Sequence, residues 1–273
     1  MKIDCHTHIV NSDIRDAYFR LADGYALVMT FLERFETFAP PDNAVALTRG
    51  DDRLFLCPAI DIHGDIQGQL DKIEMMLSSA PIVGLKVYLT YQKGRADDEK
   101  LFPIYEFAAT HRLGVTFHTG SCSLVLPTDN DMEGCNAKYV QRAAKQFPDV
   151  NFVLAHMDDP RYEECIRIVS ETDNLFTDFS GAYEPGTPEG DSFDWAIDRF
   201  KQAIDPYPDV YRKFLYGTDF CPPINLSAVT EYHKTISKIF TPEQAEEIYY
   251  HNALRAFPRL GEYLEGVNSD DLY

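Results

Sequence analysis

The segment Ile3-Asp4-Cys5-His6-Thr7-His8 carries two histidines two positions apart in an apolar run near the start of the chain. Successive side chains of a β-strand point to opposite faces, so Asp4, His6 and His8 would share one face. Two imidazoles that point the same way can bind one metal ion. The spacing therefore makes His6 and His8 candidate metal ligands.

Four more residues with metal-binding or proton-transfer chemistry stand toward the ends of later apolar runs. They are Lys86 in GLKVY, His118 in VTFHTG, His156 in FVLAHMDD and Asp219 in FLYGTDF. Imidazole and carboxylate ligands suit Zn²⁺, and catalytic zinc sites keep one coordination position open for water. The pattern predicts a catalytic metal site rather than a structural one.

Short apolar runs alternate with amphipathic, helix-like stretches, as is typical of βαβ units and a parallel sheet. The runs that we expect to be strands are 2–8, 25–31, 54–60, 83–89, 114–118, 151–156, 175–179 and 213–217. Eight such units without a linker favour one closed (β/α)8 TIM barrel over an open sheet. In a parallel barrel the C-terminal strand ends meet at one mouth, which would bring the six candidate residues together.

The helices between the strands have their own signals. Residues 66, 70, 73 and 77 are apolar at helical spacing, and helices are expected to begin at Pro160 after Asp159 and at Pro242 after Thr241. Residues 1–273 are thus predicted to be a single barrel domain. C-terminal helices from about residue 224, over 226–240 and 242–257, are expected to precede a short acidic tail.

Composition excludes some functions. Asp and Glu outnumber Lys and Arg by 44 to 25, a formal charge of −19 that would repel nucleic acids and anionic membranes. No apolar stretch is long enough to span a bilayer, and the six cysteines form no CxxC pair, so they are expected to be reduced core residues. We expect a cytoplasmic protein with a small-molecule substrate, which could also form a homo-oligomer.

The order of these residues resembles the amidohydrolase superfamily over nearly the whole chain. Its pattern is His-x-His after strand one, lysine or glutamate on strand four, histidines on strands five and six, and aspartate after strand eight. The chain is most similar to compact, amidohydrolase-2-like members without a β-sandwich domain, since His6 leaves no room for one ahead of it. The resemblance implies that His6, His8 and Asp219 bind one metal, that His118 and His156 bind a second, and that a carboxylated Lys86 bridges the two.

Residues 86–94, KVYLTYQKG, are also similar to the bridging-lysine strand of hydantoinases. In those enzymes a tyrosine five residues after the lysine stabilises an oxyanion, which implies this role for Tyr91. The expected reaction is hydrolysis of an amide, lactone or other ester by metal-activated water, with Asp219 as the proton acceptor. Zn²⁺ is the expected metal, and Mn²⁺ or Fe²⁺ could replace it.

Two alternatives stay open from the sequence. In one, a single zinc is held by His6, His8, His118 and Asp219, and His156 acts on water or substrate in a non-oxidative decarboxylase or hydratase. In the other, the barrel is a catalytically inactive binding protein, against which the intact ligand positions argue.

Residues around this set also have expected roles. Asp4 is expected either to pair with Lys86 or to support a ligand histidine. The segments 121–136 and 181–192 should overhang the mouth. We expect structural or exposed roles for the other histidines, and surface ion pairs for two arginines that could instead bind a substrate carboxylate. These residues are His63, His111, His233, His251, Arg95 and Arg142.

Overall fold

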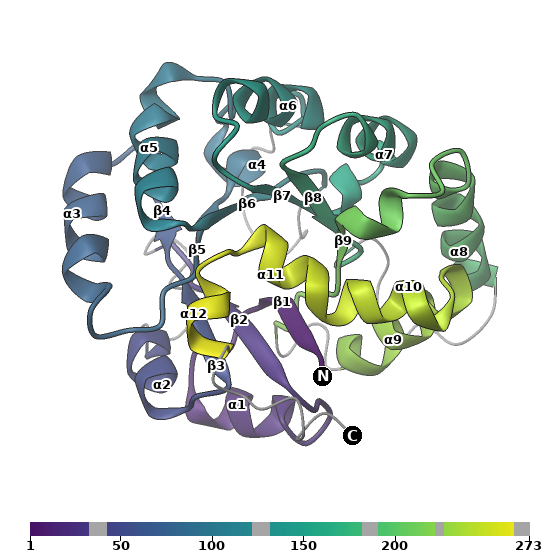
Figure 1. Cartoon of the computed structure of the whole chain (residues 1–273), viewed down its shortest axis with the longest axis horizontal. Helices are drawn as coiled ribbons and strands as arrows, with labels where there is room; N and C mark the ends of the chain where they lie inside the picture. The colour runs from purple at the N-terminus through teal and green to yellow at the C-terminus, as the bar shows by residue number, and fades with distance from the viewer. Residues whose placement is uncertain (33–42, 122–131, 182–190, 222–226, 265–273) are drawn as a thin grey trace.

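Short buried strands run parallel to one another and alternate with helices (Figure 1). The computed structural model describes residues 1–32, 43–121, 132–181, 191–221 and 227–264 of the 273-residue chain. Its strands are β1 Ile3–Thr7, β2 Tyr25–Met29, β3 Leu54–Cys57, β4 Ala59–Ile60, β5 Gly84–Val87, β6 Gly114–His118, β7 Phe152–Ala155, β8 Leu175–Asp178 and β9 Phe214–Leu215. They follow the expected runs closely because each run is a buried, apolar segment of strand length.

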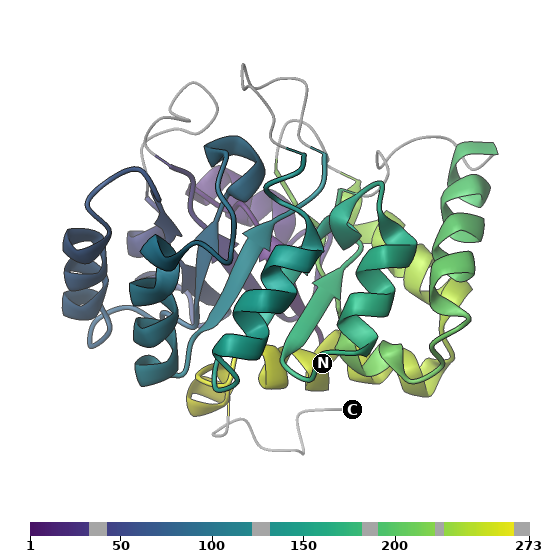
Figure 2. The same ribbon diagram turned by 90° about the horizontal axis from the view of Figure 1, so that it is seen from above.

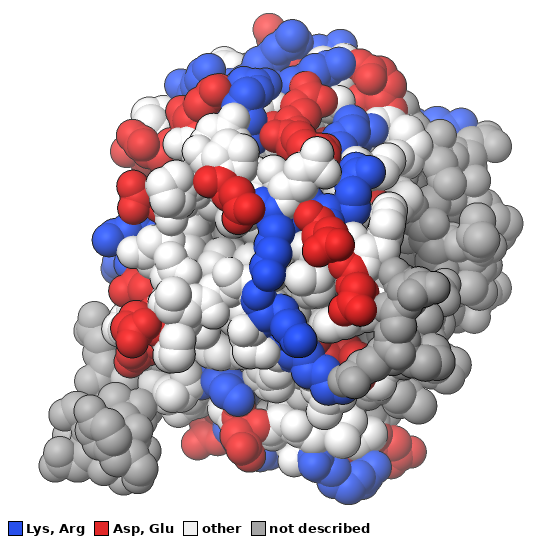
Figure 3. All heavy atoms as spheres, turned by 90° about the vertical axis from the view of Figure 1, so that its right-hand side faces the viewer, with Lys and Arg blue, Asp and Glu red and all other residues white. Residues whose placement is uncertain are grey.

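Helices surround the strands on the outside (Figure 1). They are α1 Ser12–Tyr18, α2 Ala44–Gly50, α3 Ile66–Met76, α4 Leu89–Gln92, α5 Phe102–His111, α6 Ala137–Gln146, α7 Tyr162–Ser170, α8 Asp191–Ile204, α9 Ala228–Ile239, α10 Pro242–Glu246, α11 Asn252–Ala256 and α12 Leu260–Leu264. On the side shown in Figure 3, basic and acidic side chains are interleaved over these outer helices.

The strands form a closed ring. They are ordered β1-β2-β3 and β4-β5-β6-β7-β8-β9, with β4 continuing the wall after β3. The seam between β9 and β1 is joined by backbone bonds from Cys5 N to Tyr216 O at 2.8 Å, from Asp219 N to His6 O at 2.7 Å and from His8 N to Phe220 O at 2.9 Å. The predicted TIM barrel is therefore confirmed.

One expected strand is split. The run 54–60 forms β3 and β4, with Pro58 between them. Proline has no backbone N–H and cannot donate to a ladder, although the Pro58 carbonyl still accepts from Lys86 N at 2.8 Å. The wall continues across the interruption.

The C-terminal helices close the end of the barrel where the strands begin (Figures 1 and 2). Phe257 and Leu260 pack with Ile3, Val83 and the other first inward-facing residues of the strands. A Cβ on Gly114 would lie 2.5 Å from Ala256 O, so this close packing requires glycine there. With one end filled by side chains, the opposite end is left for the site.

The start of α7 differs from the expectation. Pro160 follows a cis peptide bond and lies in a turn, and α7 begins only at Tyr162. Asp159 was expected to cap this helix, but its carboxylate instead accepts from the hydroxyls of Ser121 and Tyr162. The predicted helix start at Pro160 was therefore wrong.

The expected C-terminal helices are present. At Pro242 the capping prediction is confirmed, since Thr241 and Gln244 form a reciprocal capping box. The expected helix 242–257 comprises α10, a π-helical turn Glu247–His251 and α11, and the expected helix 226–240 is α9. The acidic tail, and most of the loops 121–136 and 181–192, lie outside the described residues.

The cysteines of the described segments carry no disulfide. Cys5, Cys57, Cys135 and Cys165 are buried free thiols and Cys221 is partly exposed, whereas Cys122 lies outside the described residues. Among the helices of these segments, none is both long and apolar enough to cross a membrane.

Candidate metal centre

The C-terminal strand ends bring together all six predicted residues. His6 lies on β1 and His8 follows it, Lys86 lies on β5, and His118 ends β6. His156 comes directly after β7, and Asp219 follows β9 in the segment that bonds to β1. The backbone of Asp219 has a left-handed φ of 50° and that of His156 a φ of 67°, so both turn sharply where their strands end.

The first group of side chains consists of His6, His8 and Asp219. Asp219 Oδ1 lies 3.1 Å from His8 Nε2 and 3.5 Å from His6 Nε2. These atoms are close enough to hold one ion between them. Lys86 Nζ lies 2.9 Å from His6 Nε2, at the edge of this group.

The second group is a pair of imidazoles. His118 Nδ1 lies 3.0 Å from His156 Nε2. The His156 ring centroid is 5.2 Å from that of His6, so the two groups adjoin. The Tyr91 ring packs on His118 with centroids 4.6 Å apart, which places the predicted oxyanion group beside the second pair.

Each of the four rings also has a nitrogen that faces an oxygen acceptor. The pairs are His6 Nδ1 with Asp178 Oδ2 at 3.2 Å, His8 Nδ1 with Met29 O at 3.0 Å, His118 Nε2 with Ser121 O at 3.1 Å, and His156 Nδ1 with Ser180 O at 2.5 Å. Carbonyl and ionised carboxylate oxygens only accept, so these nitrogens must carry the proton. The other nitrogen of each ring then carries a lone pair. That of His6 faces Lys86, that of His8 faces Asp219, and those of His118 and His156 face each other.

A cation would satisfy this arrangement. With both outer nitrogens protonated, the lone pairs of His118 Nδ1 and His156 Nε2 face each other across 3.0 Å. The same holds for His8 Nε2 and the Asp219 carboxylate at 3.1 Å. Two ligand atoms at this separation can share one ion with bond lengths of about 2.0–2.2 Å.

Electrostatics favour the neutral form of His6 and His118 and the ionised form of Asp219. Burial, followed by the charge of Lys86, lowers the pKa of His6 well below its ordinary value, and burial with His156 does the same to His118. Burial raises the pKa of Asp219, but positive charge on His6 and a hydrogen bond donated by His8 outweigh it when these rings are protonated, so that its pKa lies well below its usual range. A cation in the same place would favour the ionised carboxylate in the same way. Burial lowers the pKa of Lys86 to about 8.

Asp4 neither pairs with Lys86 nor contacts the ring of a ligand histidine, the two roles expected of it. Its carboxylate accepts from the backbone N–H groups of His6 and Thr218, both at 3.1 Å, and from the hydroxyls of Thr218 at 2.6 Å and Tyr18 at 2.9 Å. The prediction that Asp4 shares a face with His6 and His8 was wrong, because the β1 register shifts between Asp4 and Thr7 and Asp4 points outward to Tyr18 of α1. Asp4 thus fastens β1 to the segment that leads into Asp219, rather than contacting Lys86 or a ligand ring.

Sequence reasoning missed Asp178 and Ser180, which touch both groups. Asp178 ends β8, in the same position relative to its strand as the predicted ligands. That position was the available signal, but an aspartate at a strand end is also ordinary turn chemistry. Gly181 follows them with a φ of 65°, and a Cβ there would lie 2.8 Å from His156 Nδ1.

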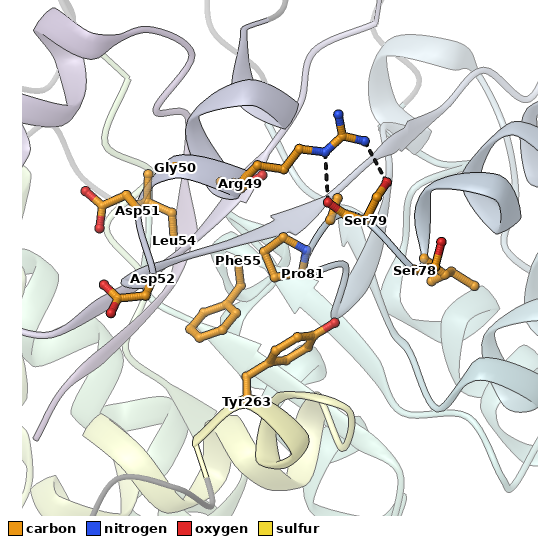
Figure 4. A pocket seen from close by; sticks show the side chains of 13 residues that line it. Arg49, Gly50, Asp51, Asp52, Leu54, Phe55, Ser78, Ser79, Pro81 and Tyr263 are labelled. Carbon is orange, nitrogen blue, oxygen red and sulfur yellow. Dashed lines mark hydrogen bonds between the residues drawn. The ribbon is translucent and has the colours of Figure 1, made fainter.

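The other singled-out residues lie outside the two groups. His63 bonds to Gln92 O, His111 lies 3.9 Å from Glu74, His233 lies between Tyr216 and Tyr249, and His251 is exposed. Arg95 and Arg142 both pair with Asp97 at the surface, as predicted. A cavity of about 710 Å³ lies between α2, the start of β3 and Tyr263, at the end away from the metal ligands (Figure 4). Arg49 in its wall is already bonded to Ser79.

Comparisons with known proteins agree with this architecture. The amidohydrolase family model matches residues 3–259. The fold is similar to an uncharacterised TIM-barrel protein of Bordetella bronchiseptica, with 17% identity over 95% of this chain and 99% of that one and a TM-score of 0.68. It is also similar to 4-oxalomesaconate hydratase of Rhodopseudomonas palustris, with 14% identity over 97% and 98% of the two chains and a TM-score of 0.63.

A third structure is 5-carboxyvanillate decarboxylase of Novosphingobium aromaticivorans, complexed with manganese and a nitrobenzoic acid. It is 12% identical over 94% of this chain and 96% of that one, with a TM-score of 0.57. A comparison with curated protein sequences finds no match. At these identities the structural likenesses establish the fold alone.

The chain therefore belongs to the amidohydrolase family. The family implies a divalent metal ion, and the residues present fit one. Imidazole nitrogens beside a carboxylate are donors that suit a divalent ion.

Proposed function

We propose that this protein is a metal-dependent hydrolase that cleaves an amide, lactone or other ester bond of a small molecule. The observation that carries the proposal is the common orientation of four histidines, each with one nitrogen donating outward and one lone pair facing inward. Such an arrangement has little value as packing, because unpaired polar atoms are costly to bury. It serves a cation that is bound at the mouth of the barrel.

The donor groups support a two-metal form with zinc. His6, His8 and Asp219 would hold one ion, and His118 and His156 a second. Lys86 would bridge them after carboxylation, which converts a buried cation into an anionic ligand. Bound in this way, the metal would supply Lewis acidity, which polarises a carbonyl group and makes water more acidic.

The protein's own groups have distinct tasks in this proposal. Asp219, held ionised and 26% exposed, can accept a proton from attacking water and pass it to the leaving group. Tyr91, packed against His118, can donate a hydrogen bond to an oxygen that becomes negative during the reaction. The fixed tautomers of the histidines keep their lone pairs aimed inward without reorganisation.

A second candidate is a one-metal decarboxylase or hydratase. It is favoured by the contact between His118 and His156, because His118 could then bind the ion with His6, His8 and Asp219 while His156 transfers protons. Two proteins of similar fold, a hydratase and a decarboxylase, support this reading.

The deciding experiment reconstitutes metal-free protein with Zn²⁺, with and without bicarbonate, and measures bound zinc. The loaded protein is then assayed on amides, lactones, esters and small carboxylates, with carbon dioxide release recorded separately. Two zinc ions and bicarbonate-dependent assembly with cleavage of a C–N or C–O bond support the hydrolase. One zinc with carbon dioxide release or water addition replaces it with the second candidate, and no bound metal with no turnover leaves a binding barrel.

A further inference from the structure

We infer that Asp178 is a positioning residue that sets the proton position on His6, so that His6 presents Nε2 to the metal. The inference rests on the proposed function for its purpose, while the tautomer itself can be measured without metal. Asp178 is 1% exposed and ends β8, and the His6 ring that it touches belongs to β1.

The two carboxylate oxygens of Asp178 have different partners. Oδ2 lies 3.2 Å from His6 Nδ1. Oδ1 accepts three hydrogen bonds, from His156 N at 3.0 Å, from Ser180 N at 2.9 Å and from Ser180 Oγ at 2.5 Å. One oxygen therefore holds the backbone around the second histidine group, and the other orients a ring of the first group.

The single hydroxyl proton of Ser180 leads to the same assignment. That proton is donated to Asp178 Oδ1, so Ser180 Oγ has only lone pairs left for other neighbours. His6 Nδ1 lies 3.0 Å and His156 Nδ1 3.1 Å from this oxygen. Both rings must therefore donate from Nδ1, which leaves both Nε2 atoms as acceptors.

The opposite side of His6 agrees. Lys86 Nζ lies 2.9 Å from His6 Nε2, and an ammonium group only donates. A carboxylate on one nitrogen and an ammonium on the other select a single tautomer. Hydrogen bonding of the remote nitrogen to a carboxylate is also known to orient metal-bound histidines and raise their basicity.

His6, His156 and Asp178 are also near enough to one another to bind a cation directly. That alternative would use His156 Nδ1, which already lies 2.5 Å from the carbonyl oxygen of Ser180. It would also turn the lone pair of His6 away from Asp219. The positioning role leaves both of these contacts intact.

The substitution Asp178→Asn tests the inference. The single amide oxygen would stay with the three donors at Oδ1, so the amide nitrogen would face His6 Nδ1. An NH₂ group donates, so the variant loses the carboxylate acceptor of the His6 Nδ1 proton and sets a donor against that nitrogen. Lys86 and Ser180 Oγ still favour Nδ1–H, so we expect a mixture in which part of the rings carry the proton on Nε2 and lack the lone pair that the metal needs. We expect zinc to bind about 10- to 100-fold more weakly than to the wild type.

Asp4→Asn is the matched control. Asp4 is as deeply buried, at 1%, and also uses one oxygen for two backbone N–H groups. Its other oxygen faces the hydroxyls of Tyr18 and Thr218, which can rotate to accept from an amide. This variant should therefore keep the wild-type tautomer of His6 and the wild-type affinity for zinc.

The measurement uses metal-free protein with ¹⁵N-labelled histidine and long-range ¹H–¹⁵N correlation spectra, which distinguish Nδ1–H from Nε2–H rings. The His6 signal among the 8 histidines is identified by its loss in His6→Gln. We expect Nδ1–H in the wild type and in Asp4→Asn, and a measurable population of Nε2–H in Asp178→Asn. Zinc affinity is measured by chelator competition, with circular dichroism to establish that each variant is folded.

An Nε2–H ring at His6 in the wild type overturns the inference, and it does so even if Asp178→Asn fails to fold. Wild-type zinc affinity in a folded Asp178→Asn protein overturns it as well. If wild-type protein binds no zinc while the tautomers behave as expected, the proposed function fails and the positioning role stands.

Discussion

Lys86 is a buried cation whose removal should make the metal-free protein more stable. It lies on β5 with 0% exposure, and burial lowers its pKa to about 8 from the ordinary 10.5. Each pH unit corresponds to about 1.4 kcal/mol, so carrying this charge inside the fold costs about 3 kcal/mol at neutral pH. Lys86→Met keeps the length and apolar stem of the side chain without the charge. We expect it to raise the free energy of unfolding by about that amount.

The effect has a defined dependence on pH. Between pH 8 and 10.5 the unfolded chain holds a proton on Lys86 that the folded chain has released, so wild-type stability should rise across this window. The methionine variant lacks that rise. Its advantage should therefore be full below pH 8 and nearly absent above about pH 10.5.

Urea unfolding of chelator-treated protein at neutral pH and near pH 10 measures both parts. Lys145→Met, an exposed position on α6, is the control and should change stability little at either pH. A Lys86→Met protein that is less stable than the wild type at neutral pH would refute the reasoning, as would an advantage that does not change with pH. Stabilisation together with lost activity would mean that the lysine is kept for function.

Three other outcomes follow from the site and its surroundings. His6→Ala with His8→Ala should abolish tight metal binding, and elemental analysis showing wild-type metal content would contradict the ligand assignment. Asp219→Asn that still binds metal should lose about 100-fold or more in kcat, whereas near wild-type kcat would move the proton transfer to His156. Burial, with the charge of Lys2, lowers the pKa of His233 to about 4, so the folded protein resists a proton that the unfolded chain accepts below pH 6.5. On acidification from pH 7 to 5, His233→Gln should therefore lose roughly 1 kcal/mol less stability than the wild type in urea unfolding; an equal loss would show that this ring does not contribute.

The features that could be predicted are those that depend on residues close together in the sequence. The two-residue spacing predicts that His6 and His8 share a face, which holds although a register shift turns Asp4 to the opposite face, and apolar strand-length runs show where the other candidates end their strands. Parallel closure then requires the C-terminal ends to meet, so the six residues could be placed at one mouth.

The unpredictable parts depend on partners far along the chain. Asp178 and His6 are 172 positions apart, and no local pattern distinguishes a carboxylate that orients a ring from one that ends a strand. Asp159 had the local signature of a helix cap, but Ser121, brought near by the barrel, takes up that carboxylate. Such competition between local and distant donors is decided only by the folded structure.

The seam between β1 and the segment 216–220 affects how the protein is made. It joins residues 5–8 to residues 216–220, which lie far apart along the chain, and it carries His6 and His8 on one side and Asp219 on the other. During synthesis one edge of β1 has no partner strand until residue 220 has left the ribosome. An unpaired strand edge can pair with the wrong strand in this interval. The group of His6, His8 and Asp219 cannot form before that moment, so an ion bound across the seam would stabilise only chains in which the seam has closed. Metal supply in the growing cell would thus affect the yield of folded protein as well as its activity.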